Sequence, residues 1–232
     1  MKDNLFMGYK YETHMHTSEV SACGRLPAKS QVQAYKKKGY TGIIMTDHFI
    51  NGLTTCPHYL SWEEKMVFIM SGYEAAKKEG DKCNLDVFFG WEFTIRGSDF
   101  LTYGLDLDFL LAYPGLDKFP IDKYSDVVRD NGGFLAQAHP FKDDYYIEYK
   151  FPVDCKYVDA IEVHNSNIPN STNKKAMEFA IANNLPMQAG TDSHGRSGMF
   201  PSGVELQEKA ESIFDIFNAI KARNVTLMLP KT

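Results

Sequence analysis

Short apolar segments alternate with longer amphipathic segments along most of this 232-residue chain. The apolar segments predict strands, and the amphipathic segments, with apolar residues three or four positions apart, predict helices. Such alternation is typical of a parallel sheet covered by helices. Roughly seven such units in a chain of this length favour a single-domain α/β barrel, closed or nearly closed, over an open sheet.

The pattern also predicts where each element lies. Strands are expected at residues 9–15, 41–46, 86–94, 100–105, 134–138, 157–163, 185–189 and 225–229. Helices are expected at residues 27–38, 62–78, 122–130, 171–183 and 208–222. No GxGxxG or Walker-type loop opens any of these helices, which argues against a nucleotide-cofactor fold. No Pro/Gly/Ser-rich linker divides the chain, so we expect one domain over residues 1–232.

Composition excludes several classes of protein. The net charge is -5 and no long basic run occurs, which argues against nucleic acid as a partner, because such binding depends on neutralising phosphates. The four cysteines are widely spaced and form no CxxC pair, so a disulfide framework is not expected. No apolar stretch suits a signal peptide or a membrane span, which predicts a cytoplasmic protein without a membrane partner.

Histidines gather at the ends of the predicted strands. Six of the seven lie at or just after the C-terminal end of a strand: His14, His16, His48, His139, His164 and His194. The strand-end carboxylates Asp47, Glu92 and Asp192 join them. These ends converge on one face of a parallel barrel, where such folds place their active sites. Imidazole and carboxylate are ligands for divalent metals, so the pattern predicts a metal cluster.

Five short motifs occur in an order that resembles the PHP (polymerase and histidinol phosphatase) family. They are THMHT at 13–17, MTDHF at 45–49, GWEF at 90–93, AHP at 138–140 and TDSH at 191–194. The resemblance implies a distorted seven-stranded β/α barrel that holds two or three divalent ions, usually zinc, manganese or iron. The matches run from near the N-terminus to about residue 195 and so cover most of the chain.

Carried over position by position, the resemblance implies a ligand set. His14, His16, Glu92 and Asp192 would hold a first ion, and Glu92 would bridge to a second ion that also binds His139. His48 and His194 would belong to a third ion. Asp47 would orient a ligand or a water, and either Asp47 or His194 could act as a catalytic acid.

The chain departs from the family pattern at several positions. Asp99 stands where many members have a histidine, so it either replaces that ligand of the second ion or only caps a strand. Glu19 or Cys23 could complete the third site, where relatives have a histidine or an aspartate. His164, Arg25 and Arg196 are candidates for substrate binding, and for both arginines a surface role is the alternative.

The expected reaction is hydrolysis of a phosphoester by a metal-activated water. The expected substrate is a small phosphomonoester, such as histidinol phosphate, a nucleoside monophosphate or a sugar phosphate. A phosphodiesterase or nuclease, a phosphotyrosine phosphatase, and a non-catalytic regulatory domain are the alternatives. The sequence predicts neither the oligomeric state nor which metal is bound.

Overall fold

The computed structural model describes residues 8–145, 147–148, 150–195 and 201–230. Its strands are β1 Tyr9–Glu12, β2 Gly42–Met45, β3 Asp86–Ile95, β4 Ser98–Tyr103, β5 Phe134–Gln137, β6 Ala160–Asn165, β7 Met187–Gly190, β8 Gly203–Leu206 and β9 Thr226–Met228. Its α-helices are α1 Ala28–Lys37, α2 Trp62–Cys83, α3 Leu107–Ala112, α4 Ile121–Asp130, α5 Asn170–Ala182 and α6 Ile213–Lys221. Two short 3₁₀ helices, η1 Leu116–Lys118 and η2 Cys155–Tyr157, complete the described elements.

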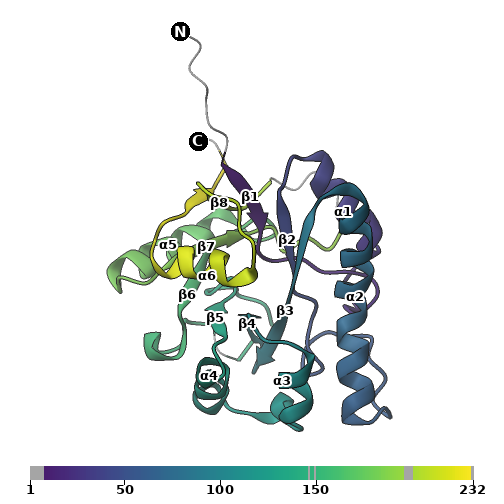
Figure 1. Cartoon of the computed structure of the whole chain (residues 1–232). Helices are drawn as coiled ribbons and strands as arrows, with labels where there is room; N and C mark the ends of the chain where they lie inside the picture. The colour runs from purple at the N-terminus through teal and green to yellow at the C-terminus, as the bar shows by residue number, and fades with distance from the viewer. Residues whose placement is uncertain (1–7, 146, 149, 196–200, 231–232) are drawn as a thin grey trace.

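The strands form one sheet, in the order β7-β6-β5-β4-β3-β2-β1-β8-β9, that curls into a nearly closed α/β barrel (Figure 1). The segments that follow β1 and β7 meet and close it. Met15 and Ser193 form a parallel bridge, and the His16 N–H donates to the Ser193 carbonyl over 2.9 Å. Strands β1 to β7 therefore make up the barrel wall, and the predicted single-domain barrel is confirmed.

Strand β4 corrects the prediction of a wholly parallel sheet, because it runs antiparallel to both β3 and β5. The cause is a two-residue turn between Ile95 and Ser98, which pair across the hairpin. Arg96 and Gly97 both have positive φ, 51° and 82°. That combination is typical of the tight turns that join antiparallel strands.

Outside the barrel wall, the described C-terminal segment also differs from the prediction. β8 was not expected; it pairs antiparallel with β1, and β9 pairs with β8. The expected helix 208–222 begins only at Ile213, because Ser212 and Asp215 form a capping box there. The short helix α3 was also missed, since six residues carry too little periodicity to predict a helix.

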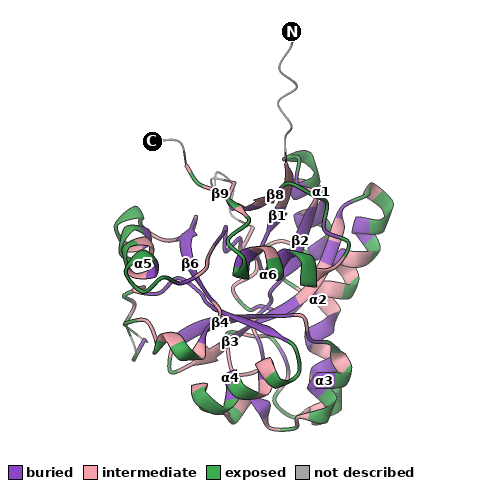
Figure 2. Cartoon of the chain, turned by 60° about the vertical axis from the view of Figure 1, so that its left-hand side comes forward, coloured by how far each residue is buried: buried purple, intermediate pink, exposed green. Residues whose placement is uncertain are grey.

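The helices lie outside the strands and cover the barrel (Figure 1). Figure 2 shows buried strands in the interior and helices whose outer faces are exposed. All residues of β4 and of β6 are buried, as expected for strands covered on both sides. Trp91, Phe93 and Tyr124 belong to the largest apolar cluster, and the ring centroids of Phe93 and Tyr124 lie 3.7 Å apart in a stacked arrangement. None of the described helices is long and apolar enough to cross a membrane.

Candidate metal centre

The barrel brings the strand-end residues together around one cavity of about 720 Å³. His14 and His16 follow β1, His48 follows β2, Glu92 lies in β3, His139 follows β5, and Asp192 and His194 follow β7. Asp99 comes from the start of β4, which lies at the same edge because β4 is antiparallel. The predicted ligands that line this cavity are His48, Glu92, Asp99, His139, Asp192 and His194. His14 and His16 are fully buried beside them.

A first group of donors consists of His14, His16 and Asp192. The Nε2 atoms of the two histidines lie 3.3 Å apart, and Asp192 Oδ1 lies 3.5 Å from the first and 3.2 Å from the second. Ligands of a tetrahedral zinc ion, each about 2.0–2.1 Å from the metal, lie roughly 3.3 Å from one another. These spacings therefore fit one divalent cation.

The hydrogen bonds of the two rings assign where their protons lie. His14 Nδ1 donates to Glu162 Oε1 over 2.9 Å. His16 Nδ1 donates to the Ser21 hydroxyl, which itself donates to Asp47. Both Nε2 atoms face the same point inside the protein, beside the Glu92 and Asp192 carboxylates. Deprotonated at Nε2, each ring could offer a lone pair to one cation bound between them.

Glu92 lies between this first group and two others. Its Oε1 lies 3.2 Å from His14 Nε2 and 3.3 Å from His139 Nε2, and together these residues form the second group. Its other oxygen lies 2.9 Å from His48 Nδ1. Oε1 is buried and makes no hydrogen bond, so it is free to bind a metal. A carboxylate in this position can bridge two cations.

The third group combines His48 and His194 with Cys23, beside His16. Of the two residues considered at the sequence level, Glu19 does not belong to it. Both Glu19 carboxylate oxygens lie 3.0 Å from the Ala28 N–H at the start of α1. Burial raises the pKa of Cys23, but hydrogen bonds to His194 and His48 and their charges bring it down to about 7.

Asp47 lies behind the metal groups rather than in the cavity. It accepts hydrogen bonds from the Thr17 N–H, the Thr17 hydroxyl and the Ser21 hydroxyl, at 2.6–2.7 Å. Burial raises its pKa to about 6, and these bonds oppose the rise. Its contact with the histidines runs through Ser21, as expected of a residue that orients a ligand.

Glu162 is a residue of the site that the sequence analysis missed. Its Oε1 accepts from His14 Nδ1, and its Oε2 accepts from the His139 backbone N–H and from Asn165 Nδ2, both at 2.9 Å. Such carboxylates fix the ring of a metal-bound histidine and make it a stronger ligand. The available signal was a glutamate inside an otherwise apolar strand, AIEVHN.

The charges of the cluster compensate one another. Burial raises the pKa of Glu92, but the charges of His14 and His48 hold it well below its usual range. Burial lowers the pKa of His14 and of His48, but the surrounding carboxylates hold both well above the usual range. Protons on the rings thus stabilise the carboxylates in the same way that cations would.

The remaining predicted residues divide into those at the cavity and those away from it. Asp99 lines the cavity, where one oxygen accepts from the Thr94 hydroxyl over 2.6 Å and the other lies 3.7 Å from His139 Nε2. Arg25 is exposed at the cavity wall. His164 is buried next to Asn173 and is not among the described residues that line the cavity. Arg196 lies outside the described residues.

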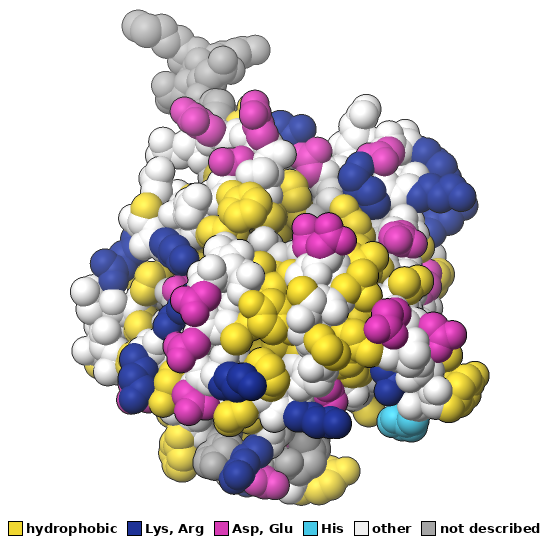
Figure 3. Space-filling view, turned by 60° about the horizontal axis from the view of Figure 1, so that its bottom comes forward, with side chains coloured by type: hydrophobic (Ala, Val, Ile, Leu, Met, Phe, Trp, Pro, Cys, Tyr) yellow, Lys and Arg dark blue, Asp and Glu magenta, His cyan; other side chains and the backbone are white. Residues whose placement is uncertain are grey.

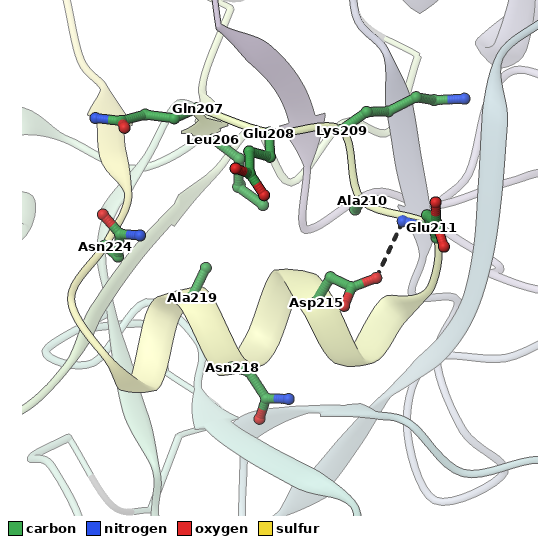
Figure 4. Close-up of a pocket in the computed structure, with 10 residues that line it drawn as sticks. All are labelled: Leu206, Gln207, Glu208, Lys209, Ala210, Glu211, Asp215, Asn218, Ala219 and Asn224. Atoms are coloured by element: carbon green, nitrogen blue, oxygen red, sulfur yellow. Dashed lines mark hydrogen bonds between the residues drawn. The ribbon is translucent and has the colours of Figure 1, made fainter.

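A separate cavity of about 490 Å³ lies between residues 206–211 and helix α6 (Figure 4). None of the candidate ligands lines it. The Asp215 carboxylate there accepts from the backbone N–H groups of Glu211 and Ser212, which caps the helix. This cavity therefore lies against the capped start of α6 and is separate from the candidate metal centre.

Comparison with known proteins gives the fold a context. No protein-family model and no curated protein sequence matches the chain. A two-domain protein from Bacteroides vulgatus containing a predicted PHP-like metal-dependent phosphoesterase is similar, with a TM-score of 0.71 and 16% identity. The match covers 95% of this chain but 64% of the other, so this chain spans less than two thirds of that protein.

Two further structures are similar over nearly their whole length. A candidate metal-dependent phosphoesterase from Bifidobacterium adolescentis has a TM-score of 0.55 at 14% identity, with 94% of this chain and 97% of the other covered. An amidohydrolase from Chromobacterium violaceum, with bound sulfate and no metal, has a TM-score of 0.57 at 11% identity, with 94% and 98% covered. The chain thus has the barrel fold of the PHP-like metal-dependent phosphoesterases, with several groups of largely buried side chains that could hold metal ions.

Proposed function

We propose that this protein is a metal-dependent phosphoesterase that hydrolyses a small phosphomonoester. The observation that carries the proposal is the position of Glu92, whose buried carboxylate faces three adjacent groups of donor side chains. We assign His14, His16 and Asp192 to one ion, and Glu92, His139 and Asp99 to another. His48 and His194 are assigned to the third group. Zinc, manganese and iron all suit such imidazole and carboxylate donors.

Divalent ions bound there would neutralise phosphate oxygens and lower the pKa of a water molecule toward ~7. The side chains hold the geometry that this requires. Glu162 and Ser21 orient His14 and His16, and the full burial of both rings keeps bulk water away from that side. Phosphoester hydrolysis needs charge stabilisation and positioning above all, so no serine or cysteine nucleophile is required.

The cavity also offers groups for a small phosphorylated substrate. Arg25 and Lys142 lie in its wall and could hold phosphate oxygens, and Tyr145 and Leu53 offer apolar surface for the rest of the molecule. A cavity of about 720 Å³ has the size of a small-molecule site. The C. violaceum protein binds sulfate, which resembles phosphate in shape and charge.

A small substrate agrees with the surface charge better than nucleic acid does. On the face that Figure 3 shows, positive and negative side chains are interspersed around a central group of hydrophobic side chains. Nucleic-acid binding is normally carried by a continuous basic surface. This face therefore offers no continuous basic surface to a polynucleotide, which agrees with a small phosphomonoester as the substrate.

The test is release of inorganic phosphate from a panel of phosphomonoesters and phosphodiesters. Apo protein would be reloaded separately with zinc, manganese or iron, and the panel would include simple amides because one structural relative is an amidohydrolase. We expect metal-dependent release from a monoester, lost in His14→Ala. Turnover of an amide or a diester alone would overturn the proposal, as would release that persists after chelation.

A further inference from the structure

We propose that Cys23 provides a thiolate ligand to the third group, so that a cation there is held by one sulfur and two imidazoles. The donor set would make this site prefer zinc or cobalt over manganese, while the other two groups offer only nitrogen and oxygen. The inference rests on the proposed function only in that both concern metal ions in the same cluster.

The first support is the position of the three side chains. One donor atom from each of Cys23, His48 and His194 lies within 4.8 Å of the others. All three residues line the same cavity. Cys23 is half-buried and forms no disulfide, so its sulfur is available as a ligand. Ligands about 2.0–2.3 Å from a shared zinc ion are well within reach of this spacing.

The loop that carries Cys23 is fixed on both sides. Before it, the Ala22 N–H donates to the Leu53 carbonyl over 2.8 Å. After it, the Arg25 N–H donates to the His194 carbonyl over 2.9 Å, which ties the loop directly to a partner of the site. At Gly24 an added Cβ would lie 2.2 Å from the Thr17 carbonyl oxygen, so only glycine allows this close approach. Cys23 is therefore preorganised beside His194.

A second observation independently indicates a cation here. His48 Nδ1 is buried and makes no hydrogen bond of acceptable geometry, although Glu92 Oε2 lies 2.9 Å away. Glu92 is 1% exposed and lines the same cavity, but its unpartnered oxygen is Oε1, which faces His14 and His139. The atom that indicates a cation at the third group is therefore His48 Nδ1. Unpartnered polar atoms in a buried site indicate a missing partner.

The other described groups do not compete with Cys23 for this role. Glu19 is engaged with the start of α1, and Ser21 with Asp47. The three remaining cysteines, Cys56, Cys83 and Cys155, belong to none of the metal-binding groups among the described residues. Cys23 is thus the described thiol that can reach a metal.

Thiolate is a softer donor than imidazole or carboxylate, and softness governs which ion a site prefers. Thiolates bind zinc and cobalt much more strongly than manganese, which prefers oxygen donors. Cys23 supplies sulfur where relatives have a histidine or an aspartate. This change should increase the preference for zinc over manganese at the third group and leave the other two groups unaffected. The protein would then combine metal sites of two chemical kinds.

Cobalt tests the ligand directly, because a thiolate bound to Co²⁺ gives a charge-transfer absorption band in the near ultraviolet. Apo protein titrated with Co²⁺ should develop this band in the wild type and in Cys83→Ser. The band should be absent in Cys23→Ser. Cys23→His should lack the band but keep the wild-type number of bound ions by elemental analysis, and it should lose preference for zinc over manganese by about tenfold or more.

A chemical readout completes the test without any activity assay. Iodoacetamide should alkylate Cys23 in the apo protein, and Zn²⁺ should protect it at least tenfold, whereas the same concentration of Mn²⁺ should not. A cobalt band that survives in Cys23→Ser, or equal protection by both ions, would overturn the inference. Circular dichroism would check that each variant folds. If Cys23→Ser does not fold, Cys23→His still provides a decisive test.

The two proposals can fail separately. A wild-type protein that shows the cobalt band but hydrolyses no phosphoester would leave the thiolate site standing and refute the proposed function. Phosphate release by a wild-type protein that shows no thiolate band would support the proposed function and refute the thiolate site.

Discussion

At the scale of single residues, the sequence revealed most of the candidate ligands because most of them follow a strand. His14, His48, His139 and His194 all stand at a strand end, and the barrel brings those ends together without further information. Glu162 was missed because it lies inside β6, where alternation predicts only a buried side chain. Cys23 remained one of two alternatives, since the folding of its loop against His194 is not visible in the sequence.

Glu162 allows a test of orientation separate from ligation. Glu162→Gln keeps the size of the side chain but replaces one carboxylate oxygen by an amide NH₂ group. The single remaining oxygen cannot accept hydrogen bonds from both His14 and His139 as the two carboxylate oxygens do. We expect metal affinity to fall about 10- to 100-fold, because partners of this kind commonly contribute that much. Isothermal titration with zinc would measure it, with the exposed Glu178→Gln as control. Unchanged affinity would show that Glu162 does not position His14.

Protonation of the histidines predicts how metal binding depends on pH. Burial lowers the pKa of His48, but the charge of Glu92 raises it well above the usual value near 6.5. A cation binds only the deprotonated ring, so it must displace protons that the apo protein still holds at neutral pH. Apparent affinity should therefore rise with pH above about 6.5.

The raised pKa of His48 also affects the stability of the apo protein, but with the opposite dependence on pH. The stabilisation from protonated His48 is fully present below a pH of about 6.5 and is lost as the pH rises through the folded-state pKa. Calorimetric titration in two buffers of different ionisation enthalpy would count the protons released by zinc near pH 7. A count of zero would contradict the prediction.

At the scale of elements, the positions of strands and helices were largely predictable, whereas their direction and exact ends were not. The hairpin at Arg96 and Gly97 reverses β4, although the apolar pattern of β4 alone fits either direction. Helix α2, expected to end at residue 78, continues to Cys83 and is terminated by Asn84 in a left-handed conformation. Tertiary contacts decide such points, because they outweigh local propensity.

Two glycines of α2 make that argument testable. At Gly72 an added Cβ would lie 2.3 Å from Asp47 Oδ2, whereas at Gly80 it would lie 2.5 Å from the Leu85 carbonyl oxygen. Alanine is favoured over glycine by roughly 1 kcal/mol inside helices, so propensity alone predicts that both substitutions stabilise. We expect both to lower the melting temperature instead, because the added methyl group would overlap its neighbours.

The two variants should differ at the metal centre. Gly72→Ala displaces Asp47, which holds Ser21 and through it His16, and should reduce the bound metal. Gly80→Ala lies at the far end of the helix and should leave the metal content unchanged. Elemental analysis of both purified proteins would distinguish them. Equal metal content would show that the helix does not support the site through Asp47.

At the scale of the whole molecule, the metal groups lie where the barrel closes. The first group joins residues after β1 to Asp192 after β7, beside the bridge between Met15 and Ser193. Glu92 and His139 extend the same cluster to β3 and β5. Cations bound there would connect strands that are distant in the sequence, so metal binding and closure of the barrel should stabilise each other.

This coupling gives a prediction for the stability of the entire fold. A ligand that binds only the native state stabilises it by about 2.7 kcal/mol at a concentration 100 times its dissociation constant. Chelation should therefore lower the melting temperature by several degrees, and zinc should restore it. In His14→Ala the difference between apo and metal-loaded protein should shrink sharply, because the first group loses a ligand that faces both Glu92 and Asp192. Equal melting temperatures with and without metal in the wild type would mean that the barrel closes through its backbone bridge alone.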